Sequence, residues 1–489
     1  MLDLQRQQAI QSAIWQACDL FRDVSGSVAG KDLTMAMLLL KYVSDIGGSP
    51  DALGNVGGDV PRFVVPEGSS FYVLSAARLE SGNGHRIDKA LGAIEQANNE
   101  LRGVFEVISF DATALGSAAQ KDRLLCQLLD VFHSNALDFR ANREGAEEAV
   151  AYACDSLVKY VAGSGKLGAD FFTPSEICQL IARLVQPEDK DAIGDPCCGS
   201  GSLLITCSQL ARERSGRGAC HLYGQEKNGS AWALARMNMV LHGETQYQLE
   251  WGDTLRDPRL LGTGGHLRKF EIVVSTPPFS LKDWGHEVAE RDAHQRYWRG
   301  VPPRMSGDYA FISHMVETLQ PETGRMVVVV SHGVLFRGAA EGQIRERLLQ
   351  ENLIDAVIGL PPKLFAHASI PVAILVLRKD KADDRVLFID ASRAYQPGKM
   401  QNVLRPTDLD LIEGTYLGRR DVSQYARLVT RTEIAANDSN LNVARYVDTT
   451  ENESEIDLSA LRVERARLTA ELETLEAKLA ALIAGGGYA

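Results

Sequence analysis

The fold of this chain is decided by the stretch Asp195-Pro196-Cys197-Cys198-Gly199-Ser200-Gly201-Ser202, which lies between a β-like run and the apolar residues Leu203-Leu204-Ile205. Glycines at a strand-to-helix turn permit positive φ and let a ligand approach the backbone closely. The dinucleotide spacing G-x-G-x-x-G is absent, because Leu204 stands where the third glycine would be. A leading Asp disfavours a pyrophosphate and suits a ligand with a cationic amino group. The turn therefore favours S-adenosylmethionine over a nicotinamide cofactor.

Acidic residues follow the next two predicted strands. Glu226 comes about 25 residues beyond the turn, where an acid can accept hydrogen bonds from both ribose hydroxyls. Asp253 ends the following strand and is placed to contact the adenine ring of the cofactor. Each acid alone is typical of a solvent-facing charge, but three acids at successive strand ends after a glycine turn predict a binding site.

Short β-rich runs alternate with helical patterns on both sides of this turn. The alternation is typical of an α/β fold with a parallel, doubly wound sheet, and Glu176–Leu184 and Ala231–Leu241 are natural crossover helices. The predicted strands are Ala192–Asp195, Cys220–Gln225, Tyr247–Trp251, Glu271–Val274, Met326–Ser331, Leu353–Leu360, Ile374–Leu377 and Val386–Ile389.

Helical patterns occupy both ends of the chain. Residues 1–155 have apolar positions at helical spacing around a Gly- and Pro-bearing insert, 47–68, which we expect to be a loop with a short strand. In the tail, leucines spaced by sevens predict a coiled-coil helix, the alternative being a surface helix packed on its own domain. The seam residues are Leu461, Leu468, Leu472, Leu475, Leu479 and Leu482. We expect a helical N-terminal domain over 1–155, an α/β cofactor-binding domain over 156–445 and a helical tail over 446–489.

Composition limits the class of protein. The balance of 45% hydrophobic and 24% charged residues is that of a soluble protein. No apolar run reaches the roughly 18–20 residues needed to cross a bilayer, and MLDLQRQQ at the start is no signal peptide, so we expect no membrane contact and a cytoplasmic protein. Eight cysteines without a CxxC pair predict reduced, buried thiols and no metal site.

The net charge of −12 is an objection to DNA binding, because a lone DNA-binding protein is usually basic. Two explanations stay open. Either the chain has a local basic surface, or a partner subunit supplies most of the affinity for DNA.

A second motif, Ile272-Val273-Val274-Ser275-Thr276-Pro277-Pro278-Phe279-Ser280, follows further along the chain. Consecutive prolines fix φ and donate no hydrogen bonds, so they leave backbone carbonyl acceptors exposed. The amino group of a flipped base could donate to such acceptors while Phe279 stacks on the base. The alternative is a simple strand-ending turn.

With these motifs the sequence resembles the N6-adenine DNA methyltransferases, and in particular the modification subunits of type I restriction–modification systems. The family has the same Asp-Pro-x-x-Gly-x-Gly loop, followed by Asn-Pro-Pro-Phe. Segments that also match are Phe171-Phe172-Thr173-Pro174, Gly307-Asp308-Tyr309-Ala310-Phe311, Leu360-Pro361-Pro362-Lys363-Leu364-Phe365, Ile370-Pro371, Phe388-Ile389-Asp390-Ala391 and Gln401-Asn402.

The resemblance implies a Rossmann-like methyltransferase fold and transfer of a methyl group from S-adenosylmethionine to N6 of a flipped adenine. It assigns Thr276, Pro277, Pro278 and Phe279 to catalysis. It also assigns a group of residues to the cofactor, and these are Phe172, Thr173, Pro174, Asp195, Gly199, Ser200, Gly201, Ser202, Glu226 and Asp253. The partners that it implies are DNA, a specificity subunit held by two modification subunits, and a restriction subunit as an optional further member.

One residue departs from the family pattern, because Thr276 stands where the family has Asn. In the family this Asn and the first proline's carbonyl accept hydrogen bonds from the target amino group. A threonine hydroxyl can also accept, but its reach is shorter and its branched Cβ restricts its rotamers. We expect retained methylation, at a full or a reduced rate. A weakened or inactive subunit that binds S-adenosylmethionine and its partners, and an N4-cytosine methyltransferase, stay open as alternatives.

The segment 284–304 mixes arginines with aromatic side chains directly after the catalytic motif. Such a mixture suits phosphate contact and stacking on an unpaired base. The predicted DNA contacts are Arg291, Arg296, Trp298, Arg299 and Arg304. An ordinary surface loop is the equal alternative, because Glu287 and Glu290 offset the basic charge.

Overall fold

The computed structural model describes residues 2–22, 27–47, 62–140, 145–163, 172–216, 220–365, 370–399, 401–449 and 458–485. Most of the predicted insert 47–68, together with Phe171, lies outside these ranges. The chain divides into two compact units, Met1–Val447 and Asp448–Ala489.

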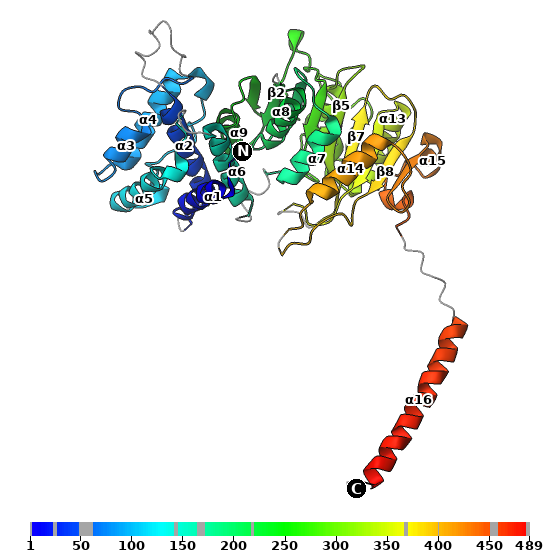
Figure 1. Ribbon diagram of the computed structural model, residues 1–489. Coiled ribbons are helices and arrows are strands. Elements are labelled where there is room, and N and C mark those ends of the chain that lie inside the picture. Colours follow the sequence, from blue (N-terminus) through cyan, green and yellow to red (C-terminus); the bar gives the residue numbers. More distant parts are fainter. Residues whose placement is uncertain are drawn as a thin grey trace. The chain divides into compact units, whose positions relative to one another are not determined.

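The first unit begins with helices, which share one apolar core (Figure 1). They are α1 (Leu4–Asp19), α2 (Ser27–Ile46), α3 (Phe71–Ala76), α4 (Asn83–Ala97), α5 (Ala118–Phe132) and α6 (Ala146–Gly163). Asp3 caps α1 by accepting the Arg6 N–H over 2.7 Å, which satisfies one of the free amides of its first turn. These elements confirm the prediction of a helical N-terminal region.

The following residues form a nine-stranded sheet in the described part of the chain. Its strands are β1 (Ala192–Asp195), β2 (His221–Glu226), β3 (Tyr247–Trp251), β4 (Ile272–Ser275), β5 (Arg325–Ser331), β6 (Ile354–Gly359), β7 (Val372–Arg378), β8 (Val386–Asp390) and β9 (Ala426–Val429). Their order is β3-β2-β1-β4-β5-β7-β6-β8-β9, so the α/β prediction is confirmed.

The prediction of a parallel sheet is wrong at one predicted strand, β7. β1 to β5 pair in parallel, as do β6 and β8, but β7 runs antiparallel to both β5 and β6. β9, which we did not predict, pairs antiparallel with β8. A buried apolar run has the same pattern in a parallel and in an antiparallel strand, so the sequence could not predict the direction of β7.

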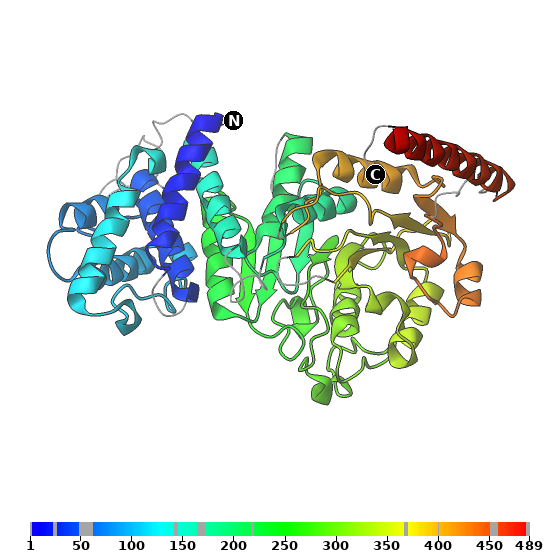
Figure 2. The same ribbon diagram turned by 90° about the horizontal axis from the view of Figure 1, so that it is seen from below.

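Helices cover both faces of the sheet (Figure 2). They are α7 (Ser175–Val185), α8 (Ser202–Ser215), α9 (Gly229–Leu241), α10 (His286–Ala289), α11 (Asp308–Glu317), α12 (Gly333–Phe336), α13 (Ala339–Gln350), α14 (Pro406–Gly418) and α15 (Arg431–Ala436). Val327 and Val329 of β5 join a core with α7, α8 and α14, while Met326 and Val328 join a core with α11, α13 and α15. The alternation confirms the doubly wound arrangement.

The second unit contains the helix α16 (Leu458–Gly485). The predicted seam leucines are each more than half exposed, as expected of a helix whose apolar stripe has no partner within its own unit. The helix is therefore present where the sequence predicts it, and its pairing in a coiled coil stays a prediction.

All eight cysteines are free thiols, and six of them are buried, in agreement with the sequence prediction. Among the residues that the structure describes, no helix is both long and apolar enough to cross a membrane.

A chain that ends at Thr449 is expected to melt within about 2 °C of the full chain, because Met1–Val447 is compact by itself and exposed segments add little to the free energy of unfolding. Differential scanning calorimetry of both proteins measures the difference. A decrease of about 5 °C or more would mean that the tail stabilises the first unit.

Candidate functional site

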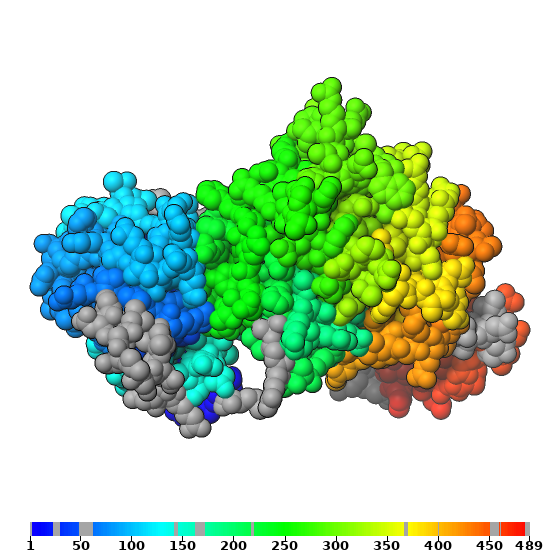
Figure 3. Space-filling model, turned by 90° about the horizontal axis from the view of Figure 1, so that it is seen from above, coloured from blue at the N-terminus to red at the C-terminus, as the bar shows by residue number. Residues whose placement is uncertain are grey.

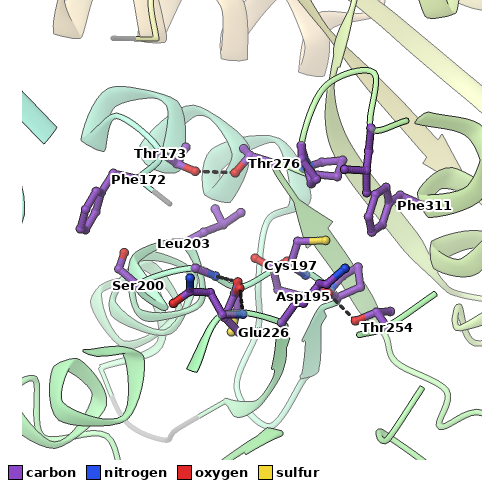
Figure 4. Close-up of a pocket in the computed structure, with 18 of the residues that line it drawn as sticks. Phe172, Thr173, Asp195, Cys197, Ser200, Leu203, Glu226, Thr254, Thr276 and Phe311 are labelled. Atoms are coloured by element: carbon purple, nitrogen blue, oxygen red, sulfur yellow. Dashed lines mark hydrogen bonds between the residues drawn. The ribbon is translucent and has the colours of Figure 1, made fainter. Parts of the chain in front are cut away.

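A cavity of about 510 Å³ lies at the carboxyl ends of β1 and β4, where the strand order reverses (Figure 4). In open α/β sheets ligands bind at this point, because the loops after the two strands diverge there. The predicted site residues that line it are Phe172, Thr173, Asp195, Gly199, Ser200, Ser202, Glu226, Asp253, Thr276, Pro277, Pro278 and Phe279. The two predicted groups, separated by about 80 residues of sequence, thus share one cavity.

Two predicted cofactor residues, Pro174 and Gly201, do not line the cavity. Pro174 precedes α7, where its carbonyl accepts the N–H groups of Ile177 and Cys178. Gly201 packs on α9, and a Cβ atom there would lie 3.1 Å from Met239 Cε.

Sequence reasoning missed several lining residues. Most of them are neighbours of predicted residues, and they are Pro196, Cys197, Cys198, Leu203, Lys227, Asn228, Thr254, Leu281, Phe311 and Phe365. Phe365 comes from the loop after β6, and its ring meets Phe279 edge to face with centroids 5.7 Å apart. The sequence feature that could have identified Phe365 is the Pro-Pro-x-Leu-Phe segment. This segment matches the family, but the resemblance assigns no function to it.

The glycine turn is held by hydrogen bonds that its backbone N–H groups donate. Gly199 has φ +54° and donates its N–H to Glu226 Oε2 over 3.0 Å. Gly201 has φ +76° and donates to the Cys198 carbonyl over 2.7 Å. Positive φ at both positions explains why the sequence has glycine there.

Asp195 is buried at the end of β1. Its Oδ1 accepts the Cys197 N–H over 2.9 Å and the Ser275 hydroxyl over 2.8 Å. Burial raises the pKa of Asp195 to about 7, although both hydrogen bonds lower it, and the nearby Glu226 raises it further. A carboxyl group in this state gains most from a cation in the cavity.

The two other acids, Glu226 and Asp253, have more hydrogen-bond and ion-pair partners within the protein. Burial raises the pKa of Glu226, against the effect of the N–H groups of Asn228, at 2.7 Å, and Gly199. Burial also acts on Asp253, but hydrogen bonds from Lys227, at 2.9 Å, and from backbone amides outweigh it and lower its pKa. Asp195 is therefore the acid with the strongest need for a ligand.

Thr276 begins the loop after β4, and its hydroxyl forms a 2.5 Å hydrogen bond with the hydroxyl of Thr173 (Figure 4). The loop is held from its other end, where Ser280 has φ +52° and donates its N–H to Asp308 Oδ1 over 3.1 Å. Asp308 is buried, and its Oδ2 accepts the Ser306 hydroxyl over 2.7 Å. The Thr-Pro-Pro-Phe loop is thus fixed at both ends by side chains.

Two of the predicted DNA contacts are engaged inside the protein. Arg296 is 2% exposed and donates to Asp292 and to the carbonyls of Thr254 and Leu255. Arg299 is equally buried between Glu317 and Glu351, with both N–O distances 2.6 Å. Neither guanidinium group has a surface to present to a phosphate, so the prediction is corrected at these two positions.

The other three predicted DNA contacts, Arg291, Trp298 and Arg304, are exposed. Trp298 donates its indole N–H to Glu317, the last residue of α11. The first residue of α11, Asp308, holds the loop after β4. Trp298 therefore lies about one helix length, roughly 15 Å, from the loop.

The sheet, with its glycine turn, its acids and its Pro-Pro-Phe loop, defines a methyltransferase of Rossmann-like fold. Residues 152–455 match the family model described as N-6 DNA Methylase, and residues 10–132 match the HsdM N-terminal domain. The chain therefore belongs to the N-6 DNA methylase family, among the modification subunits of type I restriction–modification systems.

Individual relatives agree with this membership. The chain is 30% identical to two type I restriction enzyme methylase subunits of Methanocaldococcus jannaschii. The match to the MjaVII subunit covers 76% of this chain and 64% of the relative, and the match to the MjaVIII subunit covers 84% and 71%. The crystal structure of a type I restriction-modification system methyltransferase subunit from Streptococcus thermophilus superposes with a TM-score of 0.79 at 27% identity, covering 90% of this chain and all (100%) of the other.

Replacing Asp195 by Asn is expected to stabilise the protein, and more strongly at high pH. Asn keeps an oxygen for Cys197 and Ser275 but has no charge to bury. Because the folded pKa of about 7 lies above the unfolded value, native Asp195 holds a proton that the unfolded chain releases between about pH 4 and 7, so its burial costs stability as the pH rises. Between pH 5 and pH 7 the charge on Asp195 should lower the free energy of unfolding by roughly 2–3 kcal/mol.

Urea unfolding of both proteins at pH 5 and pH 8 tests this. The gain for Asp195→Asn should be larger at pH 8, whereas the exposed Glu322→Gln should change little at either pH. An equal gain at both pH values would contradict the raised pKa.

Proposed function

We propose that this chain transfers a methyl group from S-adenosylmethionine to N6 of a flipped adenine in DNA. The observation that carries the proposal is that the glycine turn, the three acids and the Thr276–Phe279 loop line one cavity. Methyl transfer requires the methyl group and the accepting nitrogen to meet in line at short distance, and one cavity with two kinds of wall suits that requirement.

The acid-lined wall suits S-adenosylmethionine. In this proposal the buried Asp195 pairs with the cationic amino group, and this pairing offsets the cost of its burial. Each Glu226 oxygen accepts one N–H group and keeps a lone pair for a ribose hydroxyl. Asp253 is assigned to contact the adenine ring of the cofactor. Phe172 is assigned to the outer wall of the cofactor site. When bound, the cofactor supplies a methyl group on a positively charged sulfur, which is a strong electrophile.

The opposite wall suits the target base. Thr276 Oγ1 and the Pro277 carbonyl are assigned as acceptors for the N–H groups of the target amino nitrogen, which frees its lone pair for attack. The hydrogen bond to Thr173 restrains the Thr276 hydroxyl, and a hydroxyl that shares one hydrogen bond still has a lone pair to offer. The base itself stacks on Phe279, whose ring Phe365 braces from the side. The proton leaves after the transfer, so the step needs no tuned base.

The shorter reach of Thr276 supports a second candidate function. A subunit that binds S-adenosylmethionine and its partners without transferring the methyl group would keep every feature of the acid-lined wall. An N4-cytosine methyltransferase would use the same acceptors on another exocyclic amino group.

The complex that we propose contains DNA and a specificity subunit held by two copies of this chain, with a restriction subunit as an optional member. The exposed stripe of α16 suits packing on helices of the specificity subunit. Arg291, Trp298 and Arg304 stay as proposed DNA contacts. We propose 1–155, 156–445 and 446–489 as the domains that perform these separate tasks.

Co-expressed with a specificity subunit from the same source, the native chain is expected to label adenine N6 in DNA with methyl-labelled S-adenosylmethionine. Thr276→Val removes the acceptor, so kcat should fall on the order of 100-fold with cofactor affinity unchanged. Thr276→Asn restores the longer acceptor and should raise kcat. Digestion of the DNA and separation of methylated nucleosides measures the product.

The outcomes separate the candidates. Label in N4-methylcytosine would favour the cytosine enzyme. Label from Thr276→Asn alone would make the native chain a binding subunit. If both proteins bind cofactor and DNA without transferring label, the proposed function is wrong.

The affinity for S-adenosylmethionine is expected to rise up to tenfold per pH unit as the pH rises to about 7, and then to level off. Asp195 must lose its proton to pair with the amino group, and its pKa in the free protein is about 7. Calorimetry at pH 5.5, 6.5 and 7.5 measures the slope, and buffers of different ionisation enthalpy report the proton released.

Asp32→Asn is the matched control. Burial raises the pKa of Asp32 to about 6, but this residue lies on α2 and does not line the cavity. The slope should survive this substitution. If the pH dependence of the affinity disappears in Asp32→Asn, the titrating group is Asp32 and not Asp195.

A further inference from the structure

Helix α9 belongs to two apolar cores at once. Leu234 and Met237 pack with the N-terminal helices, while Ala235 and Met239 pack with the sheet and α8. A helix that is apolar on all sides is buried between layers, and α9 fits that description. In the space-filling view the blue N-terminal region meets the green part of the chain that contains α9 (Figure 3).

A buried polar side chain, Asn238, interrupts this apolar surface. It is 1% exposed and makes hydrogen bonds in two directions. Its Nδ2 donates to the Ser200 carbonyl over 2.9 Å, inside the glycine turn. Its Oδ1 accepts from the Cys154 thiol of α6 over 3.0 Å. Asn238 therefore connects an N-terminal helix to the loop that lines the cavity.

The chemistry of the two neighbours fixes the orientation of the amide group. A carbonyl oxygen can only accept, so the Ser200 oxygen requires the NH2 side of Asn238. Burial raises the pKa of Cys154 well above its usual range, so the sulfur keeps its proton and donates to the oxygen side. A flipped amide would lose both hydrogen bonds in a buried position, which is costly.

The Ser200 carbonyl lies between the two residues of the turn with positive φ, Gly199 and Gly201. The peptide that carries this carbonyl joins Ser200 to Gly201, and glycine tolerates a wide range of φ, so the peptide itself has little resistance to rotation. Asn238 holds it on the side of α9, where Gly201 also packs against Met239.

We propose that Asn238 is a positioning residue for cofactor binding, and that through it helix α6 controls the conformation of the glycine turn. The cofactor part rests on the proposed function. The positioning part concerns the turn itself and does not depend on which ligand binds there.

Calorimetric binding of S-adenosylmethionine to the full chain tests the proposal. Asn238→Leu leaves the Ser200 carbonyl without its donor and should weaken binding about tenfold or more. Cys154→Ala removes the thiol donor and should weaken it about threefold, and Cys154→Ser, which keeps a donor, should restore part of the loss. In the double variant, Cys154→Ala should have no further effect, because the amide through which it acts is gone.

Hydrogen exchange of residues 198–205 without ligand gives an independent measurement. Asn238→Leu and Cys154→Ala should both speed exchange there. Ser230→Ala is the control, because Ser230 also joins α9 to the N-terminal helices, with its hydroxyl on Asp32 at 2.8 Å, but does not line the cavity. It should leave both exchange and affinity within about twofold.

The proposal is overturned if folded Asn238→Leu binds within twofold of the native chain, or if the effects of Asn238→Leu and Cys154→Ala are additive. If Asn238→Leu does not fold, Cys154→Ala and Cys154→Ser decide: equal affinity of Cys154→Ala and the native chain, or no recovery in Cys154→Ser, overturns the proposal. If the native chain does not bind the cofactor but exchange in the turn responds as expected, the proposed function fails while the positioning role stands.

Discussion

Gly199 and Asn228 donate their N–H groups to the two oxygens of Glu226, and this carboxylate thereby joins the turn after β1 to the end of β2. A buried carboxylate is costly unless it is hydrogen-bonded, and two amides satisfy it here. The turn has little intrinsic preference for one backbone conformation, because two of its residues are glycines with positive φ. The start of α8 and the wall around Asp195 therefore depend on bonds that reach the turn from β2 and α9.

The sequence predicted the parts of the fold that have local signals. The bounds of β1 and β3 agree with the prediction, because turn residues border each run. The direction of β7 could not be predicted, since an apolar run buried on both faces looks the same in either direction. β9 was missed because Ala426–Val429 is short and only partly apolar.

The same distinction applies to the site. The acids and the Thr-Pro-Pro-Phe loop could be found because each follows a recognisable strand. The burial of Arg299 could not, because its partner Glu351 lies 52 positions further along the chain, directly after α13. The contact between Thr173 and Thr276 spans 103 positions and depends on where α7 begins. Side-chain pairs of this kind follow from the fold, so only the types of residue could be predicted and not their partners.

The acid-lined cavity also bears on the net charge. In the described lining, the acids Asp195, Glu226 and Asp253 face a single lysine, Lys227, which already pairs with Asp253. Such a wall attracts a cation and repels phosphate. The buried arginines cannot reverse that field for DNA, because carboxylates inside the protein already neutralise them. Both features agree with the proposed complex, in which the specificity subunit supplies most of the affinity for DNA.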